Sequence, residues 1–115
     1  MDMLNNRVDE FERYIINKYI QMDRFGVYMD DDGYLYLSEM YVKSEYRGKG
    51  YGSLVMDELC LFADTNGLDM RCIPSSDDDG GGDERLVRFY GRYSFEVDDD
   101  YGYGVVSVVR KYKNG

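Results

Sequence analysis

Arg47-Gly48-Lys49-Gly50-Tyr51-Gly52 lies between an extended segment, 33–42, and a segment with helical periodicity, 53–66. Three glycines within five residues let the backbone turn tightly and approach a ligand closely, because glycine has no Cβ. The turn opens a helix, whose N-terminal N–H groups and positive dipole end attract anions such as phosphates. Arg47 and Lys49 add positive charge, so the stretch predicts a strand, a pyrophosphate-binding turn and a helix. A basic turn in a surface loop is the alternative interpretation.

Two better-known phosphate loops do not fit this spacing. A P-loop requires Gly, four residues and then Gly-Lys-Ser/Thr, and the dinucleotide fingerprint requires a third glycine where Ser53 stands. The stretch instead matches Arg/Gln-x-x-Gly-x-Gly/Ala, and 40–52 resembles the fourth strand and coenzyme A loop of the GNAT-type N-acetyltransferase superfamily. Residues 88–95, Arg-Phe-Tyr-Gly-Arg-Tyr-Ser-Phe, are similar to the family's helix-to-strand element, written FYxxxGF, with Ser94 in place of the usual glycine. The resemblance starts near Phe25, so one long helix stands where the family usually has a strand and two helices.

Composition narrows the class of protein further. A chain of 115 residues with 43% hydrophobic residues and no long apolar run predicts one soluble domain, 1–115, with no membrane span. No signal peptide is recognisable, which predicts a cytoplasmic protein. Cys60 and Cys72 are expected to be reduced core residues, and the absence of histidine excludes His-based metal sites and general bases, so no metal is predicted.

The order of the expected elements predicts an α+β fold. The apolar residues of 4–22 recur at spacings of three and four, which indicates an amphipathic helix ended by Asp23-Arg24. The remaining expected elements are a hairpin of 25–29 and 34–42, a helix at 53–66, a strand at 68–73, a mobile acidic loop at 75–82, a helix at 83–93, a closing hairpin of 95–97 and 103–112, and a disordered tail at 113–115. This order implies a GNAT-like mixed, mostly antiparallel sheet with one parallel crossover between the second and third strands, flanked by about three helices.

The resemblance also implies roles for individual residues. The backbone N–H groups of Met40 and Val42 would hold the pantetheine, and that of Met40 would polarise the thioester carbonyl, which is oxyanion-type stabilisation. Tyr90 matches the general acid that returns a proton to the departing thiolate, although a core tyrosine is the alternative. The residues expected to contact the pyrophosphate are Arg47, Gly48, Lys49, Gly50, Tyr51, Gly52 and Ser53.

The general base is less clearly marked. Tyr36 occupies the position that carries a catalytic Glu in some histone-type members, and Glu39 is the nearest carboxylate on that strand. A water chain ending on Glu39 or on an acidic loop would serve the same purpose. Asp30, Asp32 and Glu39 also occupy EF-hand positions, but the required first ligand is missing and a hairpin turn explains Asp-Gly better.

Charge indicates the kind of acceptor. The net charge is −9, with a pI near 4.4, which argues against nucleic-acid binding and favours a cationic acceptor. The alternative interpretation is that the negative charge only maintains solubility. In the family the loop between the last two strands borders the acceptor site, and here it carries Asp98, Asp99 and Asp100. We therefore expect an acetyl-CoA-dependent N-acetyltransferase that acts on a primary amine (a polyamine, or a protein lysine or N-terminus) by direct attack on the thioester. The alternatives are a non-catalytic GNAT-fold binding or regulatory protein and, with less support, an acidic nucleic-acid mimic; a homodimer is left open.

Overall fold

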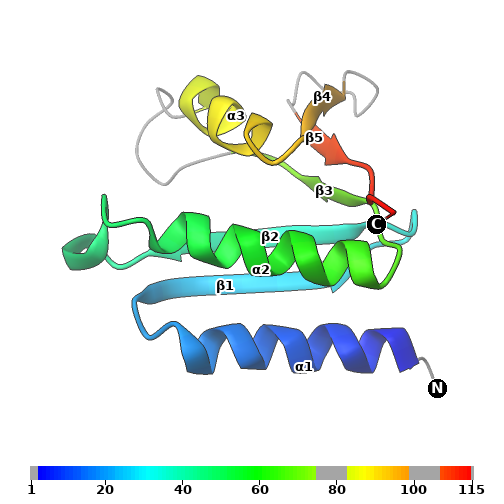
Figure 1. Cartoon of the computed structure of the whole chain (residues 1–115), viewed down its shortest axis with the longest axis horizontal. Helices are drawn as coiled ribbons and strands as arrows, with labels where there is room; N and C mark the ends of the chain where they lie inside the picture. Colours follow the sequence, from blue (N-terminus) through cyan, green and yellow to red (C-terminus); the bar gives the residue numbers. More distant parts are fainter. Residues whose placement is uncertain (1–2, 75–82, 99–106, 115) are drawn as a thin grey trace.

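A five-stranded sheet in the order β1-β2-β3-β5-β4 forms the centre of the molecule (Figure 1). The structure, a computed structural model, describes residues 3–74, 83–98 and 107–114. Only β2 and β3 are parallel; the other neighbours are antiparallel. The elements, in chain order, are α1 (Met3–Lys18), β1 (Met22–Met29), β2 (Leu35–Val42), the 3-10 turn η1 (Ser44–Tyr46), α2 (Tyr51–Thr65), β3 (Met70–Cys72), α3 (Asp83–Gly91), β4 (Glu96–Asp98) and β5 (Ser107–Arg110). The expected α+β fold, with three helices and one parallel crossover, is confirmed.

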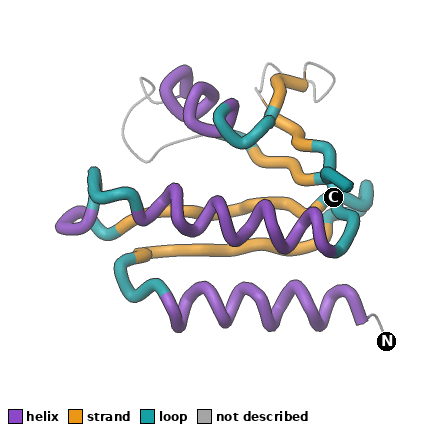
Figure 2. The backbone as a smooth tube through the Cα atoms, in the orientation of Figure 1, coloured by secondary structure: helices purple, strands orange, loops and turns teal. Residues whose placement is uncertain are grey.

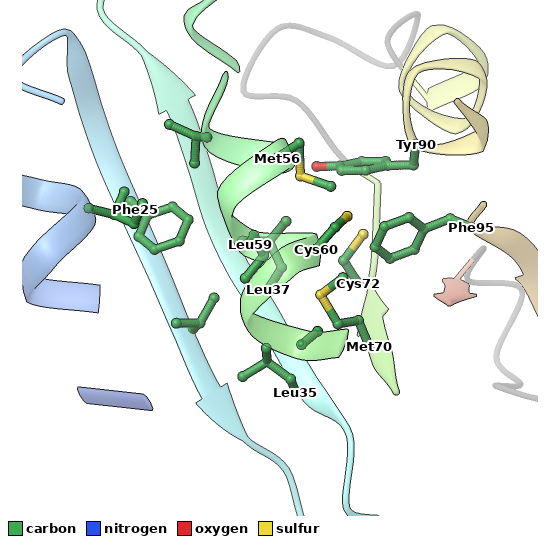
Figure 3. Close-up of a cluster of buried hydrophobic side chains, with 14 of the residues drawn as sticks. Phe25, Leu35, Leu37, Met56, Leu59, Cys60, Met70, Cys72, Tyr90 and Phe95 are labelled. Atoms are coloured by element: carbon green, nitrogen blue, oxygen red, sulfur yellow. The ribbon is translucent and has the colours of Figure 1, made fainter. Parts of the chain in front are cut away.

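All three helices pack on the same face of the sheet (Figures 1 and 2). Phe11 of α1 stacks on Phe62 of α2, with ring centroids 4.4 Å apart. The phenol of Tyr93, which follows α3, donates a hydrogen bond to the carbonyl of Ser53 in α2. The single core therefore lies between this helical layer and the inward residues of the strands, among them Leu37 (Figure 3).

Several expected boundaries were wrong, for reasons of tertiary pairing. The first helix ends at Lys18 instead of continuing to residue 22, and Met22 is buried as the first residue of β1, where it pairs with Val42. Met22 thus continues the apolar pattern without continuing the helix. The second helix begins at Tyr51, two residues early, because Gly50 already forms its N-cap. The expected hairpin segment 103–106 and the acidic loop 75–82 lie outside the described residues.

The turn between β1 and β2 forms as expected. Oδ1 of Asp30 accepts hydrogen bonds from the backbone N–H groups of Asp32 and Tyr34, both at 2.9 Å. Gly33 has a φ of 87°, a conformation that glycine adopts without steric cost. The Asp-Gly sequence therefore builds a hairpin turn, as the hairpin interpretation predicted.

Candidate active site and cofactor cleft

A β-bulge distorts β2 at the centre of the candidate site. Gly26 pairs with Glu39 and the next residue, Val27, pairs with Leu37, so Ser38 is the extra residue. Ser38 Oγ donates a 3.1 Å hydrogen bond to the carbonyl of Gly26. The bulge therefore re-aims the second half of β2 relative to the first.

Glu12 of α1 holds β1, the strand that pairs with the bulged part of β2. Its Oε1 accepts a hydrogen bond from the backbone N–H of Val27 at 3.0 Å. Glu12 was not predicted as a site residue, because in the sequence it is one more polar position on an amphipathic helix. Only the docking of α1 against β1 gives this carboxylate a role.

Beyond the bulge, β2 has no described partner strand on its β3 side, because β3 pairs with β2 over only three residues. Leu35, Tyr36 and Leu37 pair with Met70, Arg71 and Cys72, and β3 then ends. On the other edge, the N–H of Lys43 donates to the carbonyl of Gln21, just before β1. Since successive residues of a strand point their N–H groups to opposite edges, those of Val42 and Met40 point away from β1, toward the gap left by β3. The two backbone donors expected from the family resemblance thus share one edge at the opening.

The glycine-rich loop connects this opening to α2. Gly48 and Gly50 have φ angles of 78° and 89°, which only glycine adopts readily. Gly50 is the N-cap of α2 and makes no side-chain capping bond, and the first intrahelical N–H is that of Leu54. The N–H groups of 51–53 therefore point out of the helix end, where the helix dipole favours an anion.

A cleft of ≈ 290 Å³ joins these elements. Its lining combines the end of β2, the glycine loop, the first turn of α2 and one face of α3. The lining residues are Met40, Val42, Tyr46, Arg47, Gly48, Gly50, Tyr51, Gly52, Ser53, Leu86 and Phe89. Eight of the nine residues expected to bind the cofactor therefore lie together; Lys49 is the one that does not line the cleft.

Arg47 is the one charged residue among the described residues that line the cleft. Nε of Arg47 donates to the carbonyl of Val42 at 3.0 Å, which ties the loop to the end of β2 and keeps the guanidinium at the cleft. On α3, Arg85 and Arg88 are exposed next to Leu86 and Phe89 of the cleft wall. The sequence did not indicate that these two arginines lie on a wall of the cleft, because only the folded chain brings α3 next to the glycine-rich loop.

Tyr90 lies beneath the cleft wall and does not line it. Successive residues of a helix point about 100° apart, so Phe89 faces the cleft while Tyr90 is buried at the base of the helical layer, near Met56 and Cys72 (Figure 3). Burial, followed by the neighbouring Cys72 thiol, raises the pKa of Tyr90 well above its ordinary value, so the phenol is protonated at neutral pH. A protonated phenol is the form a general acid requires, and this role for Tyr90 stays a prediction.

The cysteines belong to the core. Both Cys60 and Cys72 are free and buried, and burial raises their thiol pKa values to about 11 and about 12. Neither thiol is ionised at neutral pH, so neither has the reactivity of a nucleophile.

The acidic residues predicted as general base and as part of the acceptor site, Glu39 and Asp98, do not line the cleft. Glu39 lines a second hollow, between α1 and β1, and its carboxylate is 3.6 Å from the guanidinium of Arg24. Asp98 lies 3.8 Å from the guanidinium of Arg71 on β3, so its carboxylate already has a cation. Asp99 and Asp100 lie outside the described residues.

A buried ion pair that the sequence analysis missed fixes the end of α3. Arg110, 4% exposed, binds the carboxylate of Asp64 in α2 through both terminal nitrogens, at 2.8 and 3.1 Å. Its Nε donates to the carbonyl of Tyr93 at 2.8 Å. One side chain on β5 therefore holds the C-terminal end of α2 and the turn after α3 together.

Comparison with known proteins identifies the family. The sequence profile described as Acetyltransferase (GNAT) domain matches residues 11–97, which is most of the chain. The chain therefore belongs to the GNAT acetyltransferase family. No curated protein sequence matches it.

Solved structures share the fold at low sequence identity. The anti-CRISPR protein AcrVA5 is 23% identical, with 73% of this chain and 85% of that one covered and a TM-score of 0.58. Ard1 from Thermoplasma volcanium is 18% identical, with 78% of this chain and 62% of that one covered and a TM-score of 0.59. The PaiA N-acetyltransferase from Thermoplasma acidophilum, solved in complex with coenzyme A, is 19% identical, with 76% of this chain and 52% of that one covered and a TM-score of 0.58. The chain thus spans little more than half the length of the last two proteins.

Proposed function

We propose that the protein is an acetyl-CoA-dependent N-acetyltransferase that acts on a primary amine. The observation that carries this proposal is the continuous cleft from the outward N–H groups of α2 to the opening beside β2. The first part suits a pyrophosphate, and the second lies where Met40 offers a backbone N–H to a thioester carbonyl. Figure 1 shows the loop and the start of α2 at one end of the sheet, next to β2. Two structural neighbours support the choice of ligand: the PaiA N-acetyltransferase was solved in complex with coenzyme A, and Naa50 from Arabidopsis thaliana in complex with the bisubstrate analogue CoA-Ac-MVNAL.

The reaction follows from this placement. The amine nitrogen forms a bond to the thioester carbonyl carbon while the N–H of Met40 stabilises the negative charge that develops on its oxygen. The carbon–sulfur bond then breaks and the acetyl group stays on the nitrogen. The amine proton passes to water, from which a water chain would lead to the carboxylate of Glu39 outside the cleft. The predicted proton donor for the thiolate is the phenol of Tyr90, which lies beneath the cleft wall.

A thermal-shift titration tests the cofactor. Acetyl-CoA binds the folded state only, so it should raise the melting temperature by mass action. Thiol release with a panel of amines then tests turnover. No shift at millimolar acetyl-CoA would reject the proposal at its first step.

A non-catalytic GNAT-fold binding protein is the second candidate. Tyr90 favours it, because its phenol is buried against Cys72 and does not reach the cleft lining. Under this function acetyl-CoA would still raise the melting temperature, but no amine would release thiol. The two readouts therefore separate the candidates.

A further inference from the structure

The face of the sheet opposite the helices is rich in tyrosine. On β1 and β2 the residues that alternate with the core residues point to this side, among them Tyr28, Tyr36 and Tyr41. Tyr34, in the turn before β2, lies against Arg71 of the same face. We call these four residues the tyrosine face. Within the described residues all three helices lie on the other side of the sheet, so no helix covers it.

Two of these rings already bind cations from within the chain. The guanidinium carbon of Arg71 lies 4.0 Å from the ring centroid of Tyr34, and that of Arg24 lies 4.4 Å from the centroid of Tyr41. These distances are typical of cation–π pairs. The tyrosine face is therefore built to accept positively charged side chains on aromatic rings.

The other two rings present a larger surface. Tyr28 and Tyr36 stack with centroids 5.3 Å apart and an interplanar angle of 17°, and Tyr28 is 50% exposed. Half of the Tyr28 side chain is thus available on the outside of the stack. Stacking also holds both rings in one orientation, which lowers the entropy cost of binding a partner.

Carboxylates surround this surface. Asp30 and Asp32 in the hairpin turn and Asp98 on β4 all lie within 4 Å of Arg71. Lys111, whose Nζ lies 6.0 Å from the ring centroid of Tyr34, pairs with a further carboxylate, that of Asp69. Glu39 lies at the opposite end, beside Arg24. With a chain charge of −9, a second copy of this chain would be repelled, whereas a cationic segment would be attracted.

The tyrosine face also includes the stretch of β2 whose free edge lies beside the cofactor cleft. Met40 and Val42 line the cleft on the helical side, and β3 ends at Cys72, so no described strand pairs with this part of β2 on that edge. Ser38 and Gly26, the small residues of the bulge, lie on β2 and β1 between the Tyr28–Tyr36 stack and the Arg24–Tyr41 pair. A chain lying across the tyrosine face would bring a side chain to this edge of β2 while the cleft holds a nucleotide ligand.

From these observations we infer that the tyrosine face binds a flexible, lysine-rich peptide segment, which rests on the Tyr28–Tyr36 stack and within the surrounding carboxylates. The inference rests on the proposed function for its purpose, the presentation of a lysine amine to the thioester. Its physical basis, cation–π contact and charge complementarity, does not depend on catalysis.

Direct binding tests the inference. Calorimetry in the presence of coenzyme A would compare a capped peptide of Gly-Ser-Lys repeats with the matching Gly-Ser-Gln and Gly-Ser-Glu peptides. The lysine peptide alone should bind, and more weakly as salt rises, because exposed charges are screened beyond about 8 Å at physiological ionic strength. Tyr28→Phe keeps the aromatic ring and should bind as the parent does. Tyr28→Leu keeps apolar volume without the ring and should weaken binding about two- to fivefold, the contribution of an exposed cation–π contact.

Tyr112→Leu is the matched control, since Tyr112 is 42% exposed but lies beyond the end of β5. Equal affinities for Tyr28→Phe and Tyr28→Leu, or equal binding of the glutamine peptide, would overturn the inference. So would a dimer in sedimentation that Tyr28→Leu dissociates, because the face would then belong to a second copy. A thermal shift with acetyl-CoA but no bound peptide rejects this inference alone, whereas a bound peptide without the shift rejects only the proposed function.

Discussion

Gly50 offers the sharpest test of the cofactor cleft, because charge there can be changed while shape is kept. The substitutions are Gly50→Gln and Gly50→Glu, which share size and backbone cost. Gly50 has a φ of 89°, so any side chain strains the backbone by about 1–2 kcal/mol. A Cβ at this position meets nothing within 4 Å, so crowding adds no further cost. Both variants should therefore remain folded, with Gly50→Glu more stable by about 0.3–1 kcal/mol because its carboxylate lies at the N-terminus of α2.

The difference in acetyl-CoA affinity between the two variants measures the electrostatic part of the binding free energy. Glutamate places a negative charge at the N-cap of α2, beside the N–H groups of 51–53. Two unit charges about 4 Å apart repel by about 1 kcal/mol in water and about 4 kcal/mol at an effective dielectric constant of 20. Gly50→Glu should therefore bind acetyl-CoA at least about fivefold more weakly than Gly50→Gln.

Calorimetric titration of both variants with acetyl-CoA measures this ratio, and melting curves without ligand check that both variants are folded. The ratio should fall toward one as salt rises, since the glutamate is exposed to solvent. Equal affinities at low salt would mean that no phosphate lies near Gly50, and the assignment of the loop as a pyrophosphate cradle would be refuted.

Three further predictions concern the surroundings of the cleft. Tyr90→Phe should leave the melting temperature nearly unchanged and lower turnover by about 10²–10⁴ if the phenol is the acid; full turnover across the pH range would make Tyr90 a core residue. Ser94 has a φ of 73°, a backbone conformation that is strained for any residue with a Cβ. Ser94→Gly should therefore raise the free energy of unfolding by about 1 kcal/mol in denaturant titrations, even though the exposed hydrogen bond from Lys113 is lost. A lower free energy of unfolding would contradict the presence of this strain. The hydrogen bonds from Arg110 hold the pKa of Asp64 below its ordinary value, so its stabilisation is complete above the unfolded pKa near 3.9 and is lost as pH falls through the folded pKa. Asp64→Asn should cost about 3 kcal/mol at pH 7 and progressively less in acid, and a constant difference down to pH 2 would contradict this linkage.

Local signals in the sequence were sufficient for the cofactor loop. Gly48 and Gly50 were expected in a tight turn before a helix, and the structure gives both the left-handed φ that such a turn requires. The hairpin turn at Asp30 was equally predictable, since a carboxylate two residues before its backbone partner closes the turn by itself. In each case the interacting groups are close in sequence, so no distant contact was needed to decide the conformation.

Packing decided the features that the sequence analysis missed or placed differently. Glu12 and Val27 are 15 residues apart, and Arg110 and Asp64 are 46 apart, so nothing local marks either pair. Asp98 was predicted at the acceptor site from its position in an acidic loop, and this stays a prediction; its ion pair with Arg71 on another strand could not be read from the sequence. The amino-acid sequence by itself determined the turns, the helical periodicities and the charge. Strand register and helix docking decided which side chain faces the cleft and which face of the sheet no helix covers. These features bring together residues that are far apart in the sequence, so no local pattern reveals them.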